Sequence, residues 1–204
     1  MTVTSDNRSQ GSVKVAGVAA VWLFVLMATI VTPASAAGED ASATFVVRLF
    51  VTVCIPNVGQ PENVRAWAAE QHLEPLTSPM ALNVLVGFGG NGAAWVVPST
   101  AGSFALSIRG STEACAVWAK AASPGDVETL FRRIVEGAAG PGVDVSVVKD
   151  SADRSPYGTI HTLIYSISGA EKQRGGFLYT LQTAQHPGGL FQVSLQAGRF
   201  STQQ

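Results

Sequence analysis

Charged side chains are scarce in this chain, and neither sign dominates. Of 204 residues, 13 are Lys or Arg and 14 are Asp or Glu, which gives a formal net charge of -1 with the histidines neutral. A nucleic-acid-binding protein needs a clustered basic surface, so we expect no nucleic-acid partner. The rest of the composition is rich in valine, alanine and glycine and is that of a folded protein rather than a disordered one.

Short motifs for catalysis and cofactor binding are also missing. The sequence contains no Cys-x-x-Cys, His-x-x-x-His or Gly-x-Ser-x-Gly pattern. Gly87-Phe-Gly-Gly-Asn-Gly92 does match a dinucleotide-binding loop, and Glu113 follows at a suitable distance. That loop requires a strand before it and a helix that starts inside it, whereas here a helical pattern precedes and a strand pattern follows. We therefore expect a helix end, a flexible loop and no cofactor.

The three histidines, His72, His161 and His186, are far apart in the sequence. A metal site needs two or three convergent ligands, so we expect structural roles for these residues and no bound metal. His161, Ser155 and Asp153 could form a hydrolytic triad, but nothing in the local sequence supports it.

Residues 149–158 concentrate charges between two expected strands. They lack the closing glutamate of a calcium loop, so a solvated turn is expected, with a binding rim as the alternative.

The N-terminus contains the one long apolar run. Residues 1–14 are polar and include Arg8 and Lys14, residues 16–31 carry no charge, and Ala34-x-Ala36 has the small-residue spacing of a signal-peptidase site. This order is typical of an export signal.

We therefore expect a signal peptide over residues 1–36 and a single domain over residues 37–204, located in the periplasm or secreted. The alternative is an uncleaved membrane anchor, because the apolar run is just long enough to span a bilayer. Pro33 and the small residues after it favour cleavage, after which no stable membrane insertion is expected.

Cys54 and Cys115 are the two cysteines of the chain. Because an oxidising compartment makes pairing the default, the export signal predicts a disulfide between them. Closing a loop of this length stabilises the fold by about 4 kcal/mol in the chain-entropy model.

Four segments have helical patterns. Residues 42–53 repeat apolar side chains at helical spacing, with a strand as the alternative because several of these residues are β-branched. Residues 61–72 begin with a proline, and a third segment begins at Ser78-Pro79 and stops at Gly87. The clearest pattern spans residues 124–136, where a serine cap, a proline and a following acid mark the start and five apolar residues share one face.

Seven segments have strand patterns: residues 93–97, 103–109, 115–120, 143–148, 159–167, 176–183 and 190–200. The order of elements predicts an α+β fold, in which N-terminal helices precede an antiparallel sheet of about six to seven strands with one helix packed on a face. The disulfide would join the helical half to the sheet.

The last two strands have an uncharged polar face. Its residues are Thr180, Gln182, Gln192, Ser194 and Gln196. Soluble sheets usually protect themselves with lysine or glutamate, so this face suggests contact with a protein or glycan partner. A plain solvated sheet is the alternative, because the sequence does not fix the strand register.

Structural glycines, tryptophans and cysteines recur through the mature region in Cys54, Val64-Arg-Ala-Trp67, Gly92-Ala-Ala-Trp95, Gly102-Ser-Phe-Ala-Leu106, Cys115-Ala-Val117 and Gln192-Val-Ser194. This arrangement resembles an uncharacterised group of proteobacterial exported proteins and lipoproteins. The resemblance implies an envelope location and a shared fold, and it carries over no catalytic residue. The chain departs from the lipoprotein members because it has no cysteine at the cleavage point.

Two hypotheses for function follow. The first is an exported, disulfide-bonded, non-enzymatic protein that binds a protein or glycan of the bacterial cell envelope. The second is a periplasmic hydrolase of a cell-wall or ester substrate that uses dispersed residues such as His161 and Asp153. A concave pocket that gathers His161 with a carboxylate or a serine within hydrogen-bond reach would contradict the binding-only hypothesis, and three histidines on separate surfaces would contradict the hydrolase.

Overall fold

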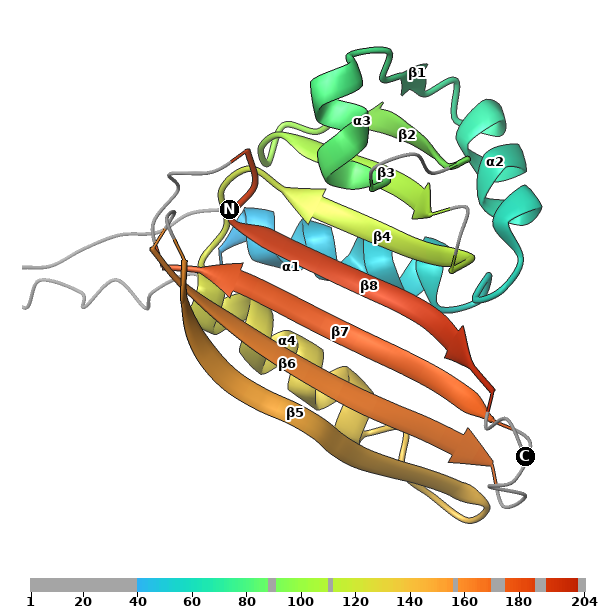
Figure 1. The fold of residues 1–204 in the computed structure, drawn as a ribbon, viewed down its shortest axis with the longest axis vertical. Helices are drawn as coiled ribbons and strands as arrows, with labels where there is room; N and C mark the ends of the chain where they lie inside the picture. Colours follow the sequence, from blue (N-terminus) through green and yellow to red (C-terminus); the bar gives the residue numbers. More distant parts are fainter. Residues whose placement is uncertain are drawn as a thin grey trace, which may run out of the picture. The chain divides into compact units, whose positions relative to one another are not determined.

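An antiparallel sheet of eight strands is the centre of the fold (Figure 1). The structure, a computed structural model, describes residues 40–87, 91–109, 112–155, 158–169, 175–185 and 190–201. All of them belong to the compact unit formed by residues 37–204. The expected signal peptide, residues 1–36, lies outside the described residues.

The helices and strands follow one another in the order α1 (Ala41–Leu49), the π-helical turn η1 (Phe50–Cys54), α2 (Pro61–Glu70), β1 (Glu74–Pro75), α3 (Pro79–Leu85), β2 (Ala93–Val97), β3 (Phe104–Arg109), β4 (Ala114–Ala119), α4 (Pro124–Glu136), β5 (Val143–Ser155), β6 (Gly158–Gly169), β7 (Gly176–Ala184) and β8 (Val193–Phe200). In the sheet the strands lie in the order β1-β2-β3-β4-β8-β7-β6-β5, so the pairing of β4 with β8 joins the early strands to the late ones.

The α+β class is confirmed, but two details of the prediction are wrong. The sheet has eight strands rather than six to seven, and the N-terminal helices are not consecutive, because β1 separates α2 from α3. β1 has two residues, one of them Pro75, so it has no length over which an alternating pattern could develop. It pairs with β2 through Glu74 opposite Val96.

Two helices, rather than α4 alone, cover one face of the sheet. α1 packs over β4, α4 packs over β7, and the two helices contact each other (Figure 1). From α4 the side chains of Val127, Phe131 and Val135 are buried, as the apolar spacing predicts. The ring of Phe50 packs against Phe131 of α4, with 6.1 Å between the ring centroids, and against Tyr179 of β7, with 5.8 Å between them. None of the described helices is long and apolar enough to cross a membrane.

Asp40 links the starts of these two helices. One of its carboxylate oxygens accepts a hydrogen bond from the Ser42 amide, 2.9 Å away, and so caps α1. The other accepts a hydrogen bond from the amide of Ser123, the residue that caps α4. A single side chain therefore accepts hydrogen bonds from backbone amides at both helix N-termini.

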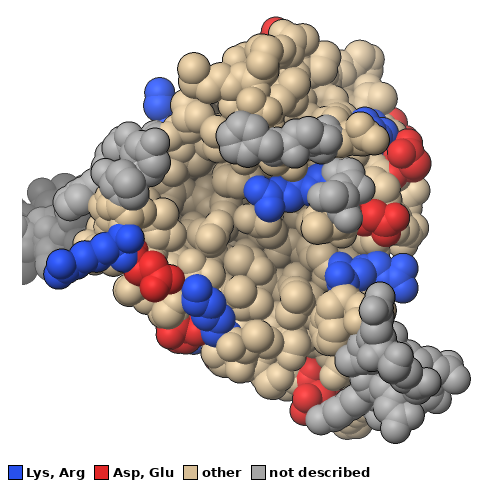
Figure 2. Space-filling model, in the orientation of Figure 1, with Lys and Arg blue, Asp and Glu red and all other residues tan. Residues whose placement is uncertain are grey.

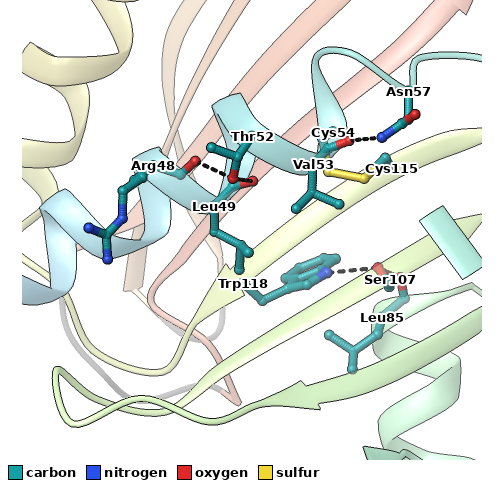
Figure 3. The surroundings of a disulfide bond; sticks show 10 residues. All are labelled: Arg48, Leu49, Thr52, Val53, Cys54, Asn57, Leu85, Ser107, Cys115 and Trp118. Carbon is teal, nitrogen blue, oxygen red and sulfur yellow. Dashed lines mark hydrogen bonds between the residues drawn. A yellow bond between two sulfur atoms is a disulfide. The ribbon is translucent and has the colours of Figure 1, made fainter. Parts of the chain in front are cut away.

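The predicted disulfide is present. Cys54 at the end of η1 pairs with Cys115 in β4, with 5.2 Å between their Cα atoms (Figure 3). Both residues are buried in the main hydrophobic core. The bond therefore fastens the first helical segment to the middle of the sheet, as the sequence predicts.

The opposite face of the sheet is covered over part of its width. Leu85 and Val86, at the end of α3, pack with side chains of β2, β3 and β4 that include Trp118. No described helix lies over β5, β6, β7 and β8 on this side, which faces the viewer in Figure 1. This uncovered area contains the polar residues singled out in the sequence.

Candidate functional site

The polar side chains predicted to share a face do so in cross-strand rows. Thr180 of β7 lies opposite Gln196 of β8, and Gln182 lies opposite Ser194. Ser194 in turn lies opposite Trp118, which packs under α3 and not in the main core. Because paired residues of an antiparallel sheet point to the same side, all four polar residues lie on the uncovered side.

β6 extends these rows by three residues that the prediction omitted. Thr162 lies opposite Gln182, Ile164 opposite Thr180, and Ser166 opposite Leu178. Their alternation with the buried Leu163, Tyr165 and Ile167 is visible in the sequence and could have identified them. We call the set formed by Thr162, Ile164, Ser166, Thr180, Gln182, Ser194 and Gln196 the open face.

The open face is uncharged. β6 and β7 contain no Lys, Arg, Asp or Glu, and the one such residue of β8, Arg199, lies opposite Phe177 on the helix side. Figure 2 shows this area as a shallow, charge-free surface with charged side chains around it. Thr180, Gln182 and Gln196 are half-buried, and Ser194 is only 3% exposed. The polar groups are therefore held close to the sheet rather than extended into water.

A cavity of about 160 Å³ lies at the β4–β8 end of the open face. Its lining includes Gln182, Ser194 and two aromatic residues, Trp118 and Phe191, whose rings are 5.6 Å apart. The indole nitrogen of Trp118 donates to the Ser107 hydroxyl at 2.9 Å, and that hydroxyl donates to the Leu85 carbonyl at 3.0 Å (Figure 3). These bonds fix the indole ring as a rigid wall.

Gln192 has a different position from the one the sequence suggested. The strand was expected to begin at residue 190, but β8 begins at Val193, so Gln192 lies just before it. Its side-chain oxygen accepts a hydrogen bond from the backbone amide of Ala122 at 3.3 Å, and its backbone amide donates to the Ala119 carbonyl at 3.0 Å. Gln192 lines the cavity, but its side-chain oxygen holds the entry to α4.

No family model, curated protein or solved structure matches this chain. The chemistry of its own side chains is therefore the basis for a functional proposal.

A second polar cluster lies on the helix side, between α4, β5 and β6. Arg132 donates to Glu128 at 2.9 Å, to Asp150 at 2.8 Å and to the Tyr165 hydroxyl at 3.0 Å. The Tyr165 hydroxyl donates to Glu136. His161 lies between two carboxylates, 2.7 Å from Asp150 and 3.1 Å from Glu128. The cluster thus connects the exposed face of α4 to both strands of the β5–β6 hairpin.

The charges of this cluster alter its proton affinities. Hydrogen bonds from Arg132, and then from His161, hold the pKa of Asp150 below its ordinary value. The bond to Asp150 in turn raises the pKa of Arg132. Burial and the hydrogen bond to Glu136 raise the pKa of Tyr165. These shifts favour the charged forms of the Asp150–Arg132 pair.

The structure does not assemble the hypothetical triad. His161 lies opposite Ala152, on the helix side, so the neighbouring Asp153 points to the other side of the sheet. Asp153 contacts Lys149 at 3.3 Å and Ser151 at 3.2 Å, and the Ser155 hydroxyl donates to the Gly158 carbonyl at 2.8 Å. The carboxylates beside His161 are those of Asp150 and Glu128, neither of which the sequence pattern singled out.

The remaining candidates have structural positions. His72 follows α2, is exposed, and has its Nδ1 atom 3.0 Å from the Glu70 carbonyl, whereas His186 lies outside the described residues. No group of three His, Cys, Asp or Glu side chains in the described part of the chain could hold a metal ion. α3 ends before Gly87 and β2 begins at Ala93, so the context of a dinucleotide loop is lacking.

The prediction of a solvated turn at residues 149–158 is wrong. Lys149–Ser155 is the second half of β5, paired with β6, and the segment between the strands is limited to residues 156 and 157, which lie outside the described residues. Polar residues on both sides of an exposed strand produce no apolar alternation, so this part of β5 could not be recognised from the sequence.

Proposed function

We propose that this protein is an exported, non-enzymatic envelope protein that binds a partner through the open face. The observation that carries the proposal is an uncovered and uncharged sheet surface whose amides and hydroxyls lie beside an aromatic-lined cavity. Sheet surfaces without a partner usually carry charged side chains, and on this side β6, β7 and β8 contribute no Lys, Arg, Asp or Glu.

The chemistry of the open face suits a neutral partner. Amide and hydroxyl side chains both donate and accept hydrogen bonds, as sugar hydroxyls and peptide groups do. Gln182 and Ser194 line the cavity, and Trp118 with Phe191 supplies an apolar wall. An envelope glycan or a neutral segment of an envelope protein fits this surface better than a strongly charged ligand.

The hydrolase is less well supported by the geometry. His161 does lie beside a carboxylate, but both of its ring nitrogens face carboxylate oxygens of Asp150 and Glu128. Each ring nitrogen is thus directed at a carboxylate rather than at a hydroxyl that could act as a nucleophile. We therefore assign His161 a structural role.

Export is supported by two independent features of the chain. The buried Cys54–Cys115 disulfide is typical of proteins that fold in an oxidising compartment. The N-terminal apolar run and the resemblance to exported envelope proteins agree with that compartment.

Binding can be tested with the double variant Gln182→Ala/Gln196→Ala. The purified protein is mixed with cell-wall glycan in a sedimentation assay, and separately with envelope proteins immobilised on a membrane. We expect the wild-type protein to bind one of the two. The variant should bind about tenfold more weakly, because two hydrogen-bonding amides are lost.

A matched control is Gln60→Ala/Gln71→Ala, which makes the same two changes at the ends of α2. This control should bind as the wild type does, and circular dichroism should show that both variants are folded. Equal binding by the wild type and the open-face variant, or no binding to either material, would contradict the proposal.

A further inference from the structure

The two edges of the sheet differ greatly in length. At one edge β1 has only 2 residues, whereas at the other edge β5 has 13. A hydrogen-bonded bridge from Gly140 closes the start of β5 at Val143. Between Lys149 and Arg154, the part of β5 considered below, no backbone hydrogen bond joins the outer edge to another described segment. Proteins normally shorten or cover such an edge, because its free amides and carbonyls can pair with another strand.

The charges on this edge are complementary to themselves. Lys149, Ser151 and Asp153 lie opposite Ile164, Thr162 and Ile160, so all three point to the side of the open face. Lys149 and Asp153 are exposed and lie at equal distances on either side of Ser151. If two copies of β5 pair antiparallel with Ser151 opposite Ser151, each Lys149 faces the Asp153 of the other copy. Directly opposed charges of unlike sign stabilise a strand pair.

The same register also suits the helix side of the strand. Asp150 would lie opposite Ala152, and its carboxylate is already paired with Arg132 and lies 2.7 Å from His161. Figure 2 shows Lys or Arg side chains alternating with Asp or Glu along the β5 side of the molecule.

A slip of the register by one residue is disfavoured. It would place Asp150 opposite Asp153 and Lys149 opposite Arg154, so that like charges meet. It would also turn the open face of one copy to the helix side of the other. The irregular register between Val147 and Lys149 marks the end of the half of β5 that this pairing uses.

We propose that two copies of this chain pair through the outer edge of β5, antiparallel, with Ser151 on the two-fold axis. The two sheets become one continuous sheet, and both open faces point to the same side. This goes beyond the proposed function, because it adds an interface away from the open face. It also gives the protein two equal binding surfaces, which raises the strength of attachment to a repetitive partner.

The test uses the protein purified as the cell makes it, studied by sedimentation velocity over a range of concentrations. The wild type should associate reversibly to a dimer. Lys149→Asp and Asp153→Lys should each weaken dimerisation by about tenfold or more, because each places like charges opposite one another. Mixing the two variants should restore the dimer, since the acidic strand of one then faces the basic strand of the other.

Two matched controls make the same changes of charge at exposed positions away from β5. Lys120→Asp lies just after β4, and Glu62→Lys lies in α2. Both should dimerise as the wild type does, and thermal unfolding should show all four variants to be folded. A wild type that stays monomeric up to its solubility limit would overturn the proposal. Single variants that dimerise as the wild type does would also overturn the proposal, because this result is expected if Ala152 rather than Ser151 lies on the two-fold axis. Mixed variants that remain monomeric would overturn it as well.

Discussion

The Nε2 atom of His161 lies 2.7 Å from a carboxylate oxygen of Asp150. Asp150 belongs to the second half of β5, which was not predicted as a strand. The other carboxylate oxygen of Asp150 accepts a hydrogen bond from Arg132. The β5–β6 hairpin and α4 are therefore joined by charge as well as by apolar packing.

This relationship predicts a pH-dependent effect of Asp150→Asn. The pKa of Asp150 is lower in the folded protein than its ordinary value, chiefly because of Arg132 and then His161. Its contribution to stability is therefore present above the ordinary pKa, about 3.9, and is lost as the pH falls through the lower folded value. The variant should unfold at a lower urea concentration than the wild type near neutral pH.

In strong acid, below the folded pKa, the two midpoints should converge. Glu70→Gln, which removes an exposed carboxylate from α2, is the control and should change the midpoint little at any pH. A difference between wild type and Asp150→Asn that stayed constant with pH would contradict the assignment.

The disulfide predicts a large loss of stability when it is removed. Cys54 and Cys115 close a loop with a sequence separation of 61. The double variant Cys54→Ala/Cys115→Ala should lower the free energy of unfolding by about 2–5 kcal/mol, measured by chemical denaturation. Reduction of the wild type should lower its free energy of unfolding to a value close to that of the variant. An unchanged denaturation midpoint in both experiments would show that the disulfide does not stabilise the fold.

The bonds behind the cavity predict a coupling between Ser107 and Trp118. Ser107→Ala should cost about 1–3 kcal/mol, because the buried indole nitrogen loses its partner. In a Trp118→Phe background the same change should cost less, since no indole nitrogen remains. Denaturation of the four proteins measures this, with Ser201→Ala as a surface control. Equal costs in both backgrounds would mean that the hydrogen bond does not stabilise the fold.

The proposed signal peptide over residues 1–36 predicts the mass of the protein found in the cell envelope. Protein recovered from the envelope should begin at Ala37 and lack two hydrogen atoms, which mass spectrometry of the intact chain detects. An intact N-terminus would show that the apolar segment is kept as an anchor. Free thiols on both cysteines would contradict the disulfide in the cell.

Local signals explain where the sequence predicted the fold well. The bounds of α4 were found because Ser123 and Pro124 mark its start and one apolar face runs through it. Alternation identified seven of the strands, and the two cysteines identified the bond between the layers. β1 and the second half of β5 were missed for the opposite reason, because neither has an apolar side to show a period.

The candidate site was predictable only in part, because it depends on which strands become neighbours. Thr180, Gln182, Ser194 and Gln196 follow from alternation in two strands. The addition of β6 depends on strand order, and the cavity depends on α3 and Trp118, which come from other parts of the chain. The position of His161 between Glu128 and Asp150 depends on how α4 packs on the sheet, which no local pattern records.

The two hydrogen bonds accepted by Asp40 set a limit on N-terminal processing. This carboxylate holds the first turn of α1 and the cap residue of α4 together. A peptidase that trimmed the chain past Asp40 would release both helix starts in one cut, and with them the layer that covers the core. The cleavage site proposed after Ala36 lies upstream of Asp40, so a chain that begins at Ala37 keeps both hydrogen bonds.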